Sequence, residues 1–206
     1  MARAKLLIIE GLDGAGKTEA VSLLRQALKE RGESVVVFRE PGGNVPAEKI
    51  RELTQSSDRP SSPAARALLF VSARKEIFDS QVNFALEGGH TVILDRSWPS
   101  TFAYSPKEEW DWIFNLHEGL GLFDHHHSIF FLDIDYATHV ARLGRRKKDV
   151  IEEELATQFD FYRDRYLTVL NDLAPEANGK VALIDATRPL SEVFLQLMAS
   201  YDEVYQ

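Results

Sequence analysis

With 206 residues, of which 44% are hydrophobic and 27% charged, the chain has the length and composition of one globular domain with a substantial core. Its formal net charge of −8 argues against binding to a nucleic-acid polymer, which favours a basic surface. The sequence has no cysteine, which excludes disulfides and a cysteine nucleophile and fits a cytoplasmic protein. Its apolar runs are too short for a signal peptide or a membrane span, so we expect no membrane partner.

A glycine-rich loop follows the first apolar run, residues 6–9, which we expect to form a buried strand. Residues 11–18, GLDGAGKT, match G-x-x-x-x-G-K-[ST] between this strand and a helix expected to stop at Gly32. Such a loop points successive N–H groups at phosphate oxygens, while Lys17 reaches the β- and γ-phosphates and the Thr18 hydroxyl binds Mg²⁺. We therefore predict an ATP or GTP site, and ATP is favoured because no N-K-x-D sequence occurs. The predicted phosphate-loop residues are Gly11, Leu12, Asp13, Gly14, Ala15, Gly16, Lys17 and Thr18.

Beyond this loop, a second buried strand is expected over residues 34–38. The polar stretch 44–61, rich in proline and serine, predicts a short helix followed by an exposed loop. Ser62 and Pro63 have the pattern of an N-cap followed by a proline at the first helical position, and the helical pattern then runs to the glycine pair 88–89.

Three side chains on that helix suggest a binding face. Arg66, Phe70 and Arg74 are spaced four residues apart and therefore share one side of the helix. An aromatic ring between two guanidinium groups suits a flat, polar base, on which Phe70 would stack while Arg74 donates to a carbonyl oxygen. The alternative is that Phe70 belongs to the core and the arginines are solvated, and the helix taken alone favours this alternative.

The third expected strand, residues 91–94, ends in Asp95 and Arg96. Residues at the carboxyl end of a parallel strand point into the crevice where ligands bind. Asp95 would hold Mg²⁺ through water and Arg96 would clamp the phosphate of an acceptor, whereas a structural salt bridge is the alternative. Another helix start is indicated at Ser105 and Pro106.

Three consecutive histidines, residues 125–127, precede the fourth expected strand, residues 128–134. Adjacent side chains on an extended chain point in alternate directions, so these three do not converge on one metal ion without a special loop. We therefore expect a loop that enters the strand.

The last third of the chain contains a run of cations within residues 142–148, a pattern that usually marks a solvated surface. A long amphipathic helix, a fifth strand over residues 180–184 and a helix from about Pro189 follow. Strands and helices that alternate in this way predict an α/β fold, in which helices cover a parallel sheet.

Taken in order, the motifs of this chain resemble those of the thymidylate kinase family. They are the E-G-x-x-G-A-G-K-T loop, R-E-P-G-G at 39–43, the L-x-F-x-x-x-R helix at 68–74, D-R-x-x-x-S-x-x-A-Y at 95–104, the basic segment and I-D-A-T at 184–187. The resemblance implies a single P-loop kinase domain over residues 1–206, with three layers, a five-stranded parallel sheet and a lid near 142–154. It also implies ATP·Mg²⁺ as phosphoryl donor, dTMP as acceptor, dTDP as product and a homodimer.

The resemblance further assigns roles to individual residues. Asp13 would reach the 3′-hydroxyl of the acceptor, and Tyr104 would pack under its deoxyribose and exclude a ribonucleotide. A lid cation, Arg145 or Arg146, would replace the arginine that some members of the family carry at Ala15. The implied catalytic residues are Lys17, Asp13, Arg96, Arg145 and Arg146; Arg142 is implied to bind ATP; the implied acceptor-binding residues are Arg39, Phe70, Arg74, Arg96, Thr101 and Tyr104; and the implied metal-binding residues are Thr18 and Asp95.

The sequence departs from the family at three places, and these leave alternatives open. Glu19 stands where a second hydroxyl residue is usual, and residues 97–99, Ser-Trp-Pro, are unusual after the Asp-Arg pair. Residues 105–112, SPKEEWDW, stand where a glycine-rich loop commonly follows the Ala-Tyr pair. A deoxyribonucleoside kinase is one alternative, because the sequences EP at 40–41 and DRS at 95–97 would satisfy its pattern. Kinases of another, possibly modified, deoxynucleoside monophosphate and a regulatory ATPase without an acceptor pocket are the others.

Overall fold

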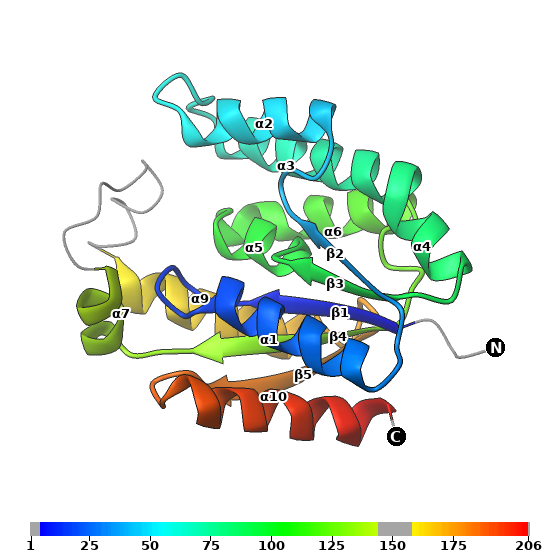
Figure 1. Cartoon of the computed structure of the whole chain (residues 1–206). Helices are drawn as coiled ribbons and strands as arrows, with labels where there is room; N and C mark the ends of the chain where they lie inside the picture. Colours follow the sequence, from blue (N-terminus) through cyan, green and yellow to red (C-terminus); the bar gives the residue numbers. More distant parts are fainter. Residues whose placement is uncertain (1–4, 144–157, 206) are drawn as a thin grey trace.

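The computed structural model describes residues 5–143 and 158–205, in which five parallel strands form one sheet in the order β2-β3-β1-β4-β5 (Figure 1). The expected parallel α/β fold is confirmed, and every strand ends within one residue of its predicted bounds. The strands are β1 (Lys5–Glu10), β2 (Val35–Arg39), β3 (Thr91–Asp95), β4 (His127–Asp133) and β5 (Gly179–Asp185).

The central strands are apolar along nearly their whole length because helices cover both faces of the sheet. Leu7, Ile93 and Phe130, from β1, β3 and β4, are completely buried. In the sheet register, Asp95 at the end of β3 lies beside Ile9 of β1 and Arg39 of β2. The loops that follow these three strands therefore open at the same edge of the sheet, where an α/β protein binds its ligands.

The helices form a layer on each side of the sheet. In Figure 1, α1 lies in front of the sheet and packs against α10, whereas α9 lies behind it and packs against α5. The pair α2 and α3 packs together above the end of the sheet at which the cleft opens. The bounds of these helices are α1 Lys17–Glu30, α2 Val45–Gln55, α3 Pro63–Ile77, α5 Trp98–Ala103, α9 Phe159–Asp172 and α10 Leu190–Tyr205.

Two helix predictions need correction. The short helix α5 was not predicted, and the helix expected from Ser105 and Pro106 starts only at Trp110 as α6 (Trp110–Gly119), after a 3₁₀ turn, η2 (Lys107–Glu109). The helix expected from 62 to 88–89 is confirmed as one path of α3, a π-helical turn η1 (Phe78–Val82) and α4 (Asn83–Glu87). The last described helix before the basic segment is α7 (Tyr136–Leu143).

The last of the three consecutive histidines belongs to β4, and the two before it lie in the loop that enters the strand, as expected. His127 is the first residue of β4, is buried, and accepts a hydrogen bond at Nε2 from the Trp98 indole nitrogen at 3.0 Å. Its Nδ1 donates to the carbonyl oxygen of His125. Among residues 5–143 and 158–205, no group of His, Asp and Glu side chains is arranged to hold a metal ion, and no helix has the length and apolar character to cross a membrane.

The amino end of the sheet, opposite the loops that follow β1, β2 and β3, contains a cluster around Glu33. Its carboxylate accepts hydrogen bonds from the Thr91 hydroxyl at 2.6 Å, the Tyr201 hydroxyl at 2.5 Å and the Lys5 ammonium at 3.2 Å. The cluster therefore connects β1 and β3 with α10 and with the turn after α1.

Candidate active site

The loop between β1 and α1 has the backbone of a phosphate-binding loop. Gly11, Gly14 and Gly16 adopt φ angles of 149°, 83° and 89°, which favour glycine. A Cβ atom at Gly11 would lie only 2.7 Å from the backbone oxygen of Leu132, so the loop can pass this close to β4 only with glycine at this position. Gly16 directly precedes α1, whose positive end is therefore at the loop.

The lysine of the loop is folded over the loop itself. Lys17 is 9% exposed, and its Nζ donates to the carbonyl oxygens of Gly11 and Leu12, each at 3.0 Å. The same Nζ lies 3.6 Å from Oδ1 of Asp13. Burial lowers the pKa of Lys17, and the nearby Arg96 acts in the same direction. The ammonium group is thus positioned inside the cleft, at the place where phosphate oxygens would meet the loop.

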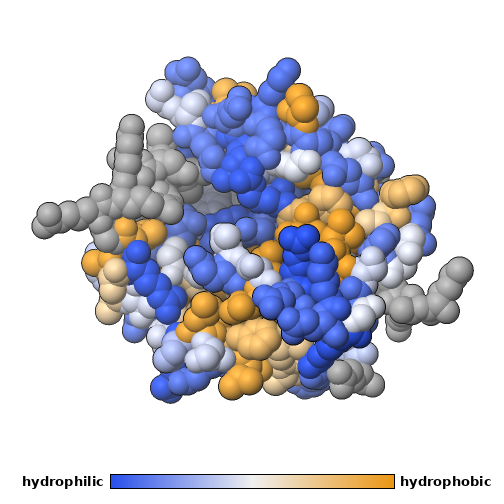
Figure 2. Space-filling view, viewed as in Figure 1, coloured by the Kyte–Doolittle hydropathy of each residue, from blue (hydrophilic) through white to orange (hydrophobic). Residues whose placement is uncertain are grey.

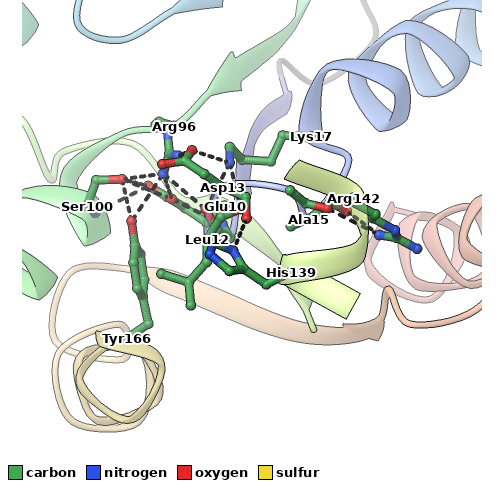
Figure 3. A network of polar contacts seen from close by, with 12 residues as sticks. Glu10, Leu12, Asp13, Ala15, Lys17, Arg96, Ser100, His139, Arg142 and Tyr166 are labelled. Carbon is green, nitrogen blue, oxygen red and sulfur yellow. Dashed lines mark hydrogen bonds and ion pairs between the residues drawn. The ribbon is translucent and has the colours of Figure 1, made fainter. Parts of the chain in front are cut away.

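Arg96, which directly follows β3, connects the phosphate loop with Tyr166 of α9 (Figure 3). It has a φ of 68°, a conformation that is rare outside glycine and is often found at functional sites. Its guanidinium forms an ion pair with Asp13 and donates to the carbonyl oxygen of Gly11 at 3.0 Å and the hydroxyl of Tyr166 at 3.3 Å. Burial raises the pKa of Asp13, but Arg96 and Lys17 outweigh burial and lower the pKa to about 2. Asp13 is therefore ionised at neutral pH.

A buried carboxylate fixes α5 to the end of β1. Glu10 is fully buried and accepts hydrogen bonds from the backbone N–H groups of Ser97, at 2.9 Å, and Ser100, at 3.2 Å. It also accepts from the Ser100 hydroxyl at 2.9 Å. These contacts set the position of α5, and with it that of Arg96, which precedes α5, and of Thr101, which lies within it.

A single cleft of about 680 Å³ contains most of the predicted site. Figure 2 shows it as a hollow with a mainly hydrophilic rim. Its walls come from the phosphate loop, the segments after β2 and β3, and helices α2, α3, α5, α7 and α10. The predicted residues that line it are Asp13, Gly14, Ala15, Gly16, Lys17, Thr18, Arg39, Phe70, Arg74, Asp95, Arg96, Thr101, Tyr104 and Arg142.

The wall opposite the phosphate loop combines an aromatic ring with a held guanidinium. Phe70 is half-buried and lines the cleft, and it is not among the buried residues of the core. Arg74 is buried, and its Nε donates to Glu40 at 2.6 Å, while its two terminal nitrogens lie 2.7 Å from His117 Nε2 and 3.1 Å from the Thr101 hydroxyl. The guanidinium thus reaches the cleft while protein groups on three sides fix its plane.

Three other predicted cations are held by protein groups. Arg39 is half exposed and forms an ion pair with Glu48 at 2.8 Å. Arg142 donates to the carbonyl oxygen of Gly14 at 3.3 Å. Arg66 donates to the carbonyl oxygens of residues 60 and 61 and does not line this cleft, so its place beside a base stays a prediction.

The remaining predicted residues differ in whether they reach the cleft. Thr18 and Glu19 are both exposed at the cleft, and Glu19 forms no ion pair within the described part of the chain. Gly11 and Leu12, the first two residues of the phosphate loop, are buried and do not line the cleft. The lid residues Arg145 and Arg146 lie outside the described residues, so their predicted role stays a prediction.

Several site residues were missed by the sequence reasoning. Glu10 and Ser100 belong to motifs that were quoted, but nothing in their spacing shows that they meet. His117 and Tyr166 carry no motif at all. They reach the site from α6 and α9, and the contact between His117 and Arg74 joins residues 43 positions apart.

A parallel sheet of this order, with a phosphate loop after its central strand and an aromatic and cationic wall across the cleft, defines a P-loop kinase. The family model described as thymidylate kinase matches residues 9–197, and the chain belongs to the thymidylate kinase family.

Individual relatives agree with this assignment. The chain is similar to a thymidylate kinase of Haemophilus ducreyi, with 35% identity over 93% of this chain and 90% of that protein. It is also similar to a thymidylate kinase of Nitrosospira multiformis, with 33% identity over 98% of this chain and 99% of that protein. The solved structure of thymidylate kinase from Ehrlichia chaffeensis has the same fold, with a TM-score of 0.73 and 22% identity over 98% of this chain and all of that one.

Proposed function

We propose that this protein transfers the γ-phosphoryl group of ATP to the phosphate of dTMP and forms dTDP and ADP. In this reaction an oxygen of the dTMP phosphate bonds to the γ-phosphorus while the bond to the β-phosphate oxygen breaks. The observation that supports the proposal best is that one cleft joins the phosphate loop with the wall formed by Phe70 and Arg74. A donor and an acceptor nucleotide bound at these two places would meet between Lys17 and Arg96.

On the donor side, the backbone N–H groups of the phosphate loop and Lys17 would hold the β- and γ-phosphates. Mg²⁺ suits the residues present, because it prefers oxygen ligands and the Thr18 hydroxyl and the Asp95 carboxylate line the same cleft. When bound, Mg²⁺ would neutralise charge on the phosphates. Arg142, which lies against the phosphate loop, would contact the nucleotide at the cleft rim.

On the acceptor side, Arg96 would clamp the dTMP phosphate with help from Arg39. Phe70 would stack on the base, and Arg74 would donate to a carbonyl oxygen, with Thr101 beside it. Tyr104 would pack under the deoxyribose, and Asp13 would accept a hydrogen bond from the 3′-hydroxyl. The ionised state of Asp13 suits it to that acceptor role.

The structure offers an argument against the deoxyribonucleoside kinase alternative. That reaction needs a free carboxylate after β2 to deprotonate a nucleoside hydroxyl. Glu40 occupies this position, but it is 3% exposed and accepts hydrogen bonds from Arg74 at 2.6 Å and from the Ser97 hydroxyl at 3.1 Å. We infer that Glu40 orients Arg74 instead of acting as a base.

A product assay tests the proposal. The purified protein is incubated with ATP and Mg²⁺ and with dTMP, dUMP, dCMP, dGMP, UMP or thymidine in parallel, and dTMP should have the highest kcat/KM. Lys17→Ala should remove orders of magnitude in turnover, because a cation at the transferring phosphoryl group is lost. Faster phosphorylation of thymidine, or ATP hydrolysis without any nucleotide product, would contradict the proposal.

We also infer a cytoplasmic homodimer from the family resemblance. Sedimentation velocity at micromolar concentrations measures the oligomeric state directly, and a monomer under these conditions would contradict this part of the proposal.

A further inference from the structure

We propose that His117 is a positioning residue for the acceptor base: its imidazole accepts a hydrogen bond from Arg74 and thereby sets the direction in which that guanidinium points into the cleft. The inference rests on the proposed function, in which Arg74 contacts the base.

The hydrogen bonds of His117 determine which of its nitrogens carries the proton. Nδ1 lies 2.8 Å from the carbonyl oxygen of Ile113, which can only accept, so Nδ1 carries the hydrogen. Nε2 is then an acceptor, and it lies 2.7 Å from a terminal nitrogen of Arg74. A protonated imidazole would instead oppose one positive charge with another, and burial already disfavours its charged form. The neutral tautomer is therefore the form that fits the contacts.

His117 has little freedom to move. It is completely buried, and its ring stacks on Phe123 with a centroid distance of 5.1 Å and an angle of 10° between the planes. Phe102 packs at 5.5 Å on the same ring. A rigid acceptor of this kind holds the hydrogen bond from Arg74 in one direction.

The three acceptors around Arg74 complement one another. Glu40 binds Nε from the end of β2, Thr101 binds one terminal nitrogen from α5, and His117 binds the other from α6. Because a guanidinium is planar, contacts at all three nitrogens fix both its plane and its rotation. The remaining N–H groups of the terminal nitrogens are left for a ligand, since no other described residue accepts from Arg74. Without His117, only Glu40 and Thr101 would hold the guanidinium, and its terminal nitrogen on the side of α6 would have no fixed acceptor.

The experiment compares two substitutions at this position. His117→Phe keeps an aromatic ring between Phe102 and Phe123 but removes the acceptor, whereas His117→Gln places an amide oxygen near the position of Nε2. We expect His117→Phe to raise KM for dTMP about tenfold and to lower the preference for dTMP over dCMP, because a hydrogen bond to a charged group is lost. KM for ATP should stay within about twofold, and His117→Gln should restore the dTMP preference.

The matched control is His127→Phe. His127 is also buried and also accepts from a nitrogen donor, the indole of Trp98, but it has no contact with Arg74. The His127→Phe variant should have a lower thermal midpoint of unfolding and an unchanged acceptor preference. If His117→Phe does not fold, His117→Asn replaces it, because the asparagine side chain is too short to reach Arg74 while it can still bond to Ile113.

Arg74→Leu separates the two ways in which the idea could fail. If Arg74→Leu leaves the acceptor preference unchanged, the proposed contact between Arg74 and the base is wrong. If Arg74→Leu removes the preference but His117→Phe keeps it, or if the Gln and Phe variants are equally impaired, the contact with the base stands and the positioning role of His117 is overturned.

Discussion

At the scale of single residues, the backbone at Gly11 passes so close to β4 that no side chain fits there. Gly11 combines a φ of 149° with a missing Cβ that would lie 2.7 Å from a carbonyl oxygen of β4. Glu19, in contrast, is exposed at the rim of the same cleft. Positions within the phosphate loop and directly after it therefore differ greatly in the changes that they tolerate.

Substitution of Gly11 by alanine should be costly. The added Cβ forces the loop away from β4 and strains its backbone, so Gly11→Ala should lower the free energy of unfolding by about 1–3 kcal/mol and weaken ATP binding. Urea denaturation and ATP titration measure the two effects. Gly119→Ala is the control, because nothing lies within 4 Å of a Cβ at that helical position. Equal stability of the two variants would mean that the loop relaxes without cost.

Substitution of Glu19 by threonine should strengthen ATP binding only slightly. The carboxylate would repel phosphate oxygens, but water screens an exposed charge, so the gain in affinity should be about twofold. Isothermal titration of ATP at low and high salt provides the test, and the gain should shrink as salt rises. A gain of tenfold or more would show that Glu19 turns into the cleft when ATP binds.

At the scale of elements, strands and helices differ in how far their sequence determines them. The strands were predicted to within one residue because each is a short apolar run buried between helices. Helix α5 was not predicted, because its sequence WPSTFA has no helical periodicity and its start is held by Glu10, which lies 87 positions before Ser97. The phosphate loop is local and was found from its motif, whereas the contacts of His117 and Tyr166 depend on packing between distant segments.

Loss of the carboxylate that holds α5 should affect stability and catalysis together. In Glu10→Gln the amide oxygen can still accept from the N–H groups of Ser97 and Ser100, but the amide N–H₂ then replaces the second carboxylate oxygen, which accepts from the backbone N–H of Gly11 at 3.3 Å. Two donors would face each other there and the buried negative charge beside Arg96 would be lost, which should cost about 2–3 kcal/mol of unfolding free energy. Because Arg96 and Thr101 move with α5, kcat should fall as well. The control is Glu48→Gln, whose exposed pair with Arg39 contributes no more than about 1 kcal/mol. If Glu10→Gln loses the expected free energy of unfolding but keeps its kcat, α5 keeps its position without the carboxylate of Glu10.

At the scale of the whole molecule, stability should depend on pH through two buried histidines. Burial lowers the pKa of His117 to about 3, with Arg74 acting in the same direction, and burial lowers the pKa of His127 to about 4. The unfolded chain takes up protons on both imidazoles near their usual pKa of about 6.5, so the unfolded state binds more protons than the folded state below that pH. Stability should therefore fall as the pH drops from about 6.5 towards 4.

Urea unfolding at two pH values checks this expectation. Between about pH 7 and about pH 5, each imidazole should remove on the order of 2 kcal/mol of unfolding free energy. His127→Phe should remove roughly half of this pH dependence, since one of the two titrating groups is gone. Asp13, whose pKa is lowered to about 2, adds a further loss only below its usual pKa near 4. An unchanged pH dependence in His127→Phe would assign the acid sensitivity to other groups.

The cluster around Glu33 lies at the amino end of the sheet, whereas the cleft opens at its carboxyl end. Stabilising substitutions often reduce activity because they stiffen or fill a working site. In this molecule that trade-off should apply to one end of the sheet only. The region around Glu33 is thus the place where heat resistance could be engineered at no cost in turnover, with the hydrogen bonds of Glu33 left intact. Directed evolution for thermal tolerance under selection for activity should accumulate its changes there.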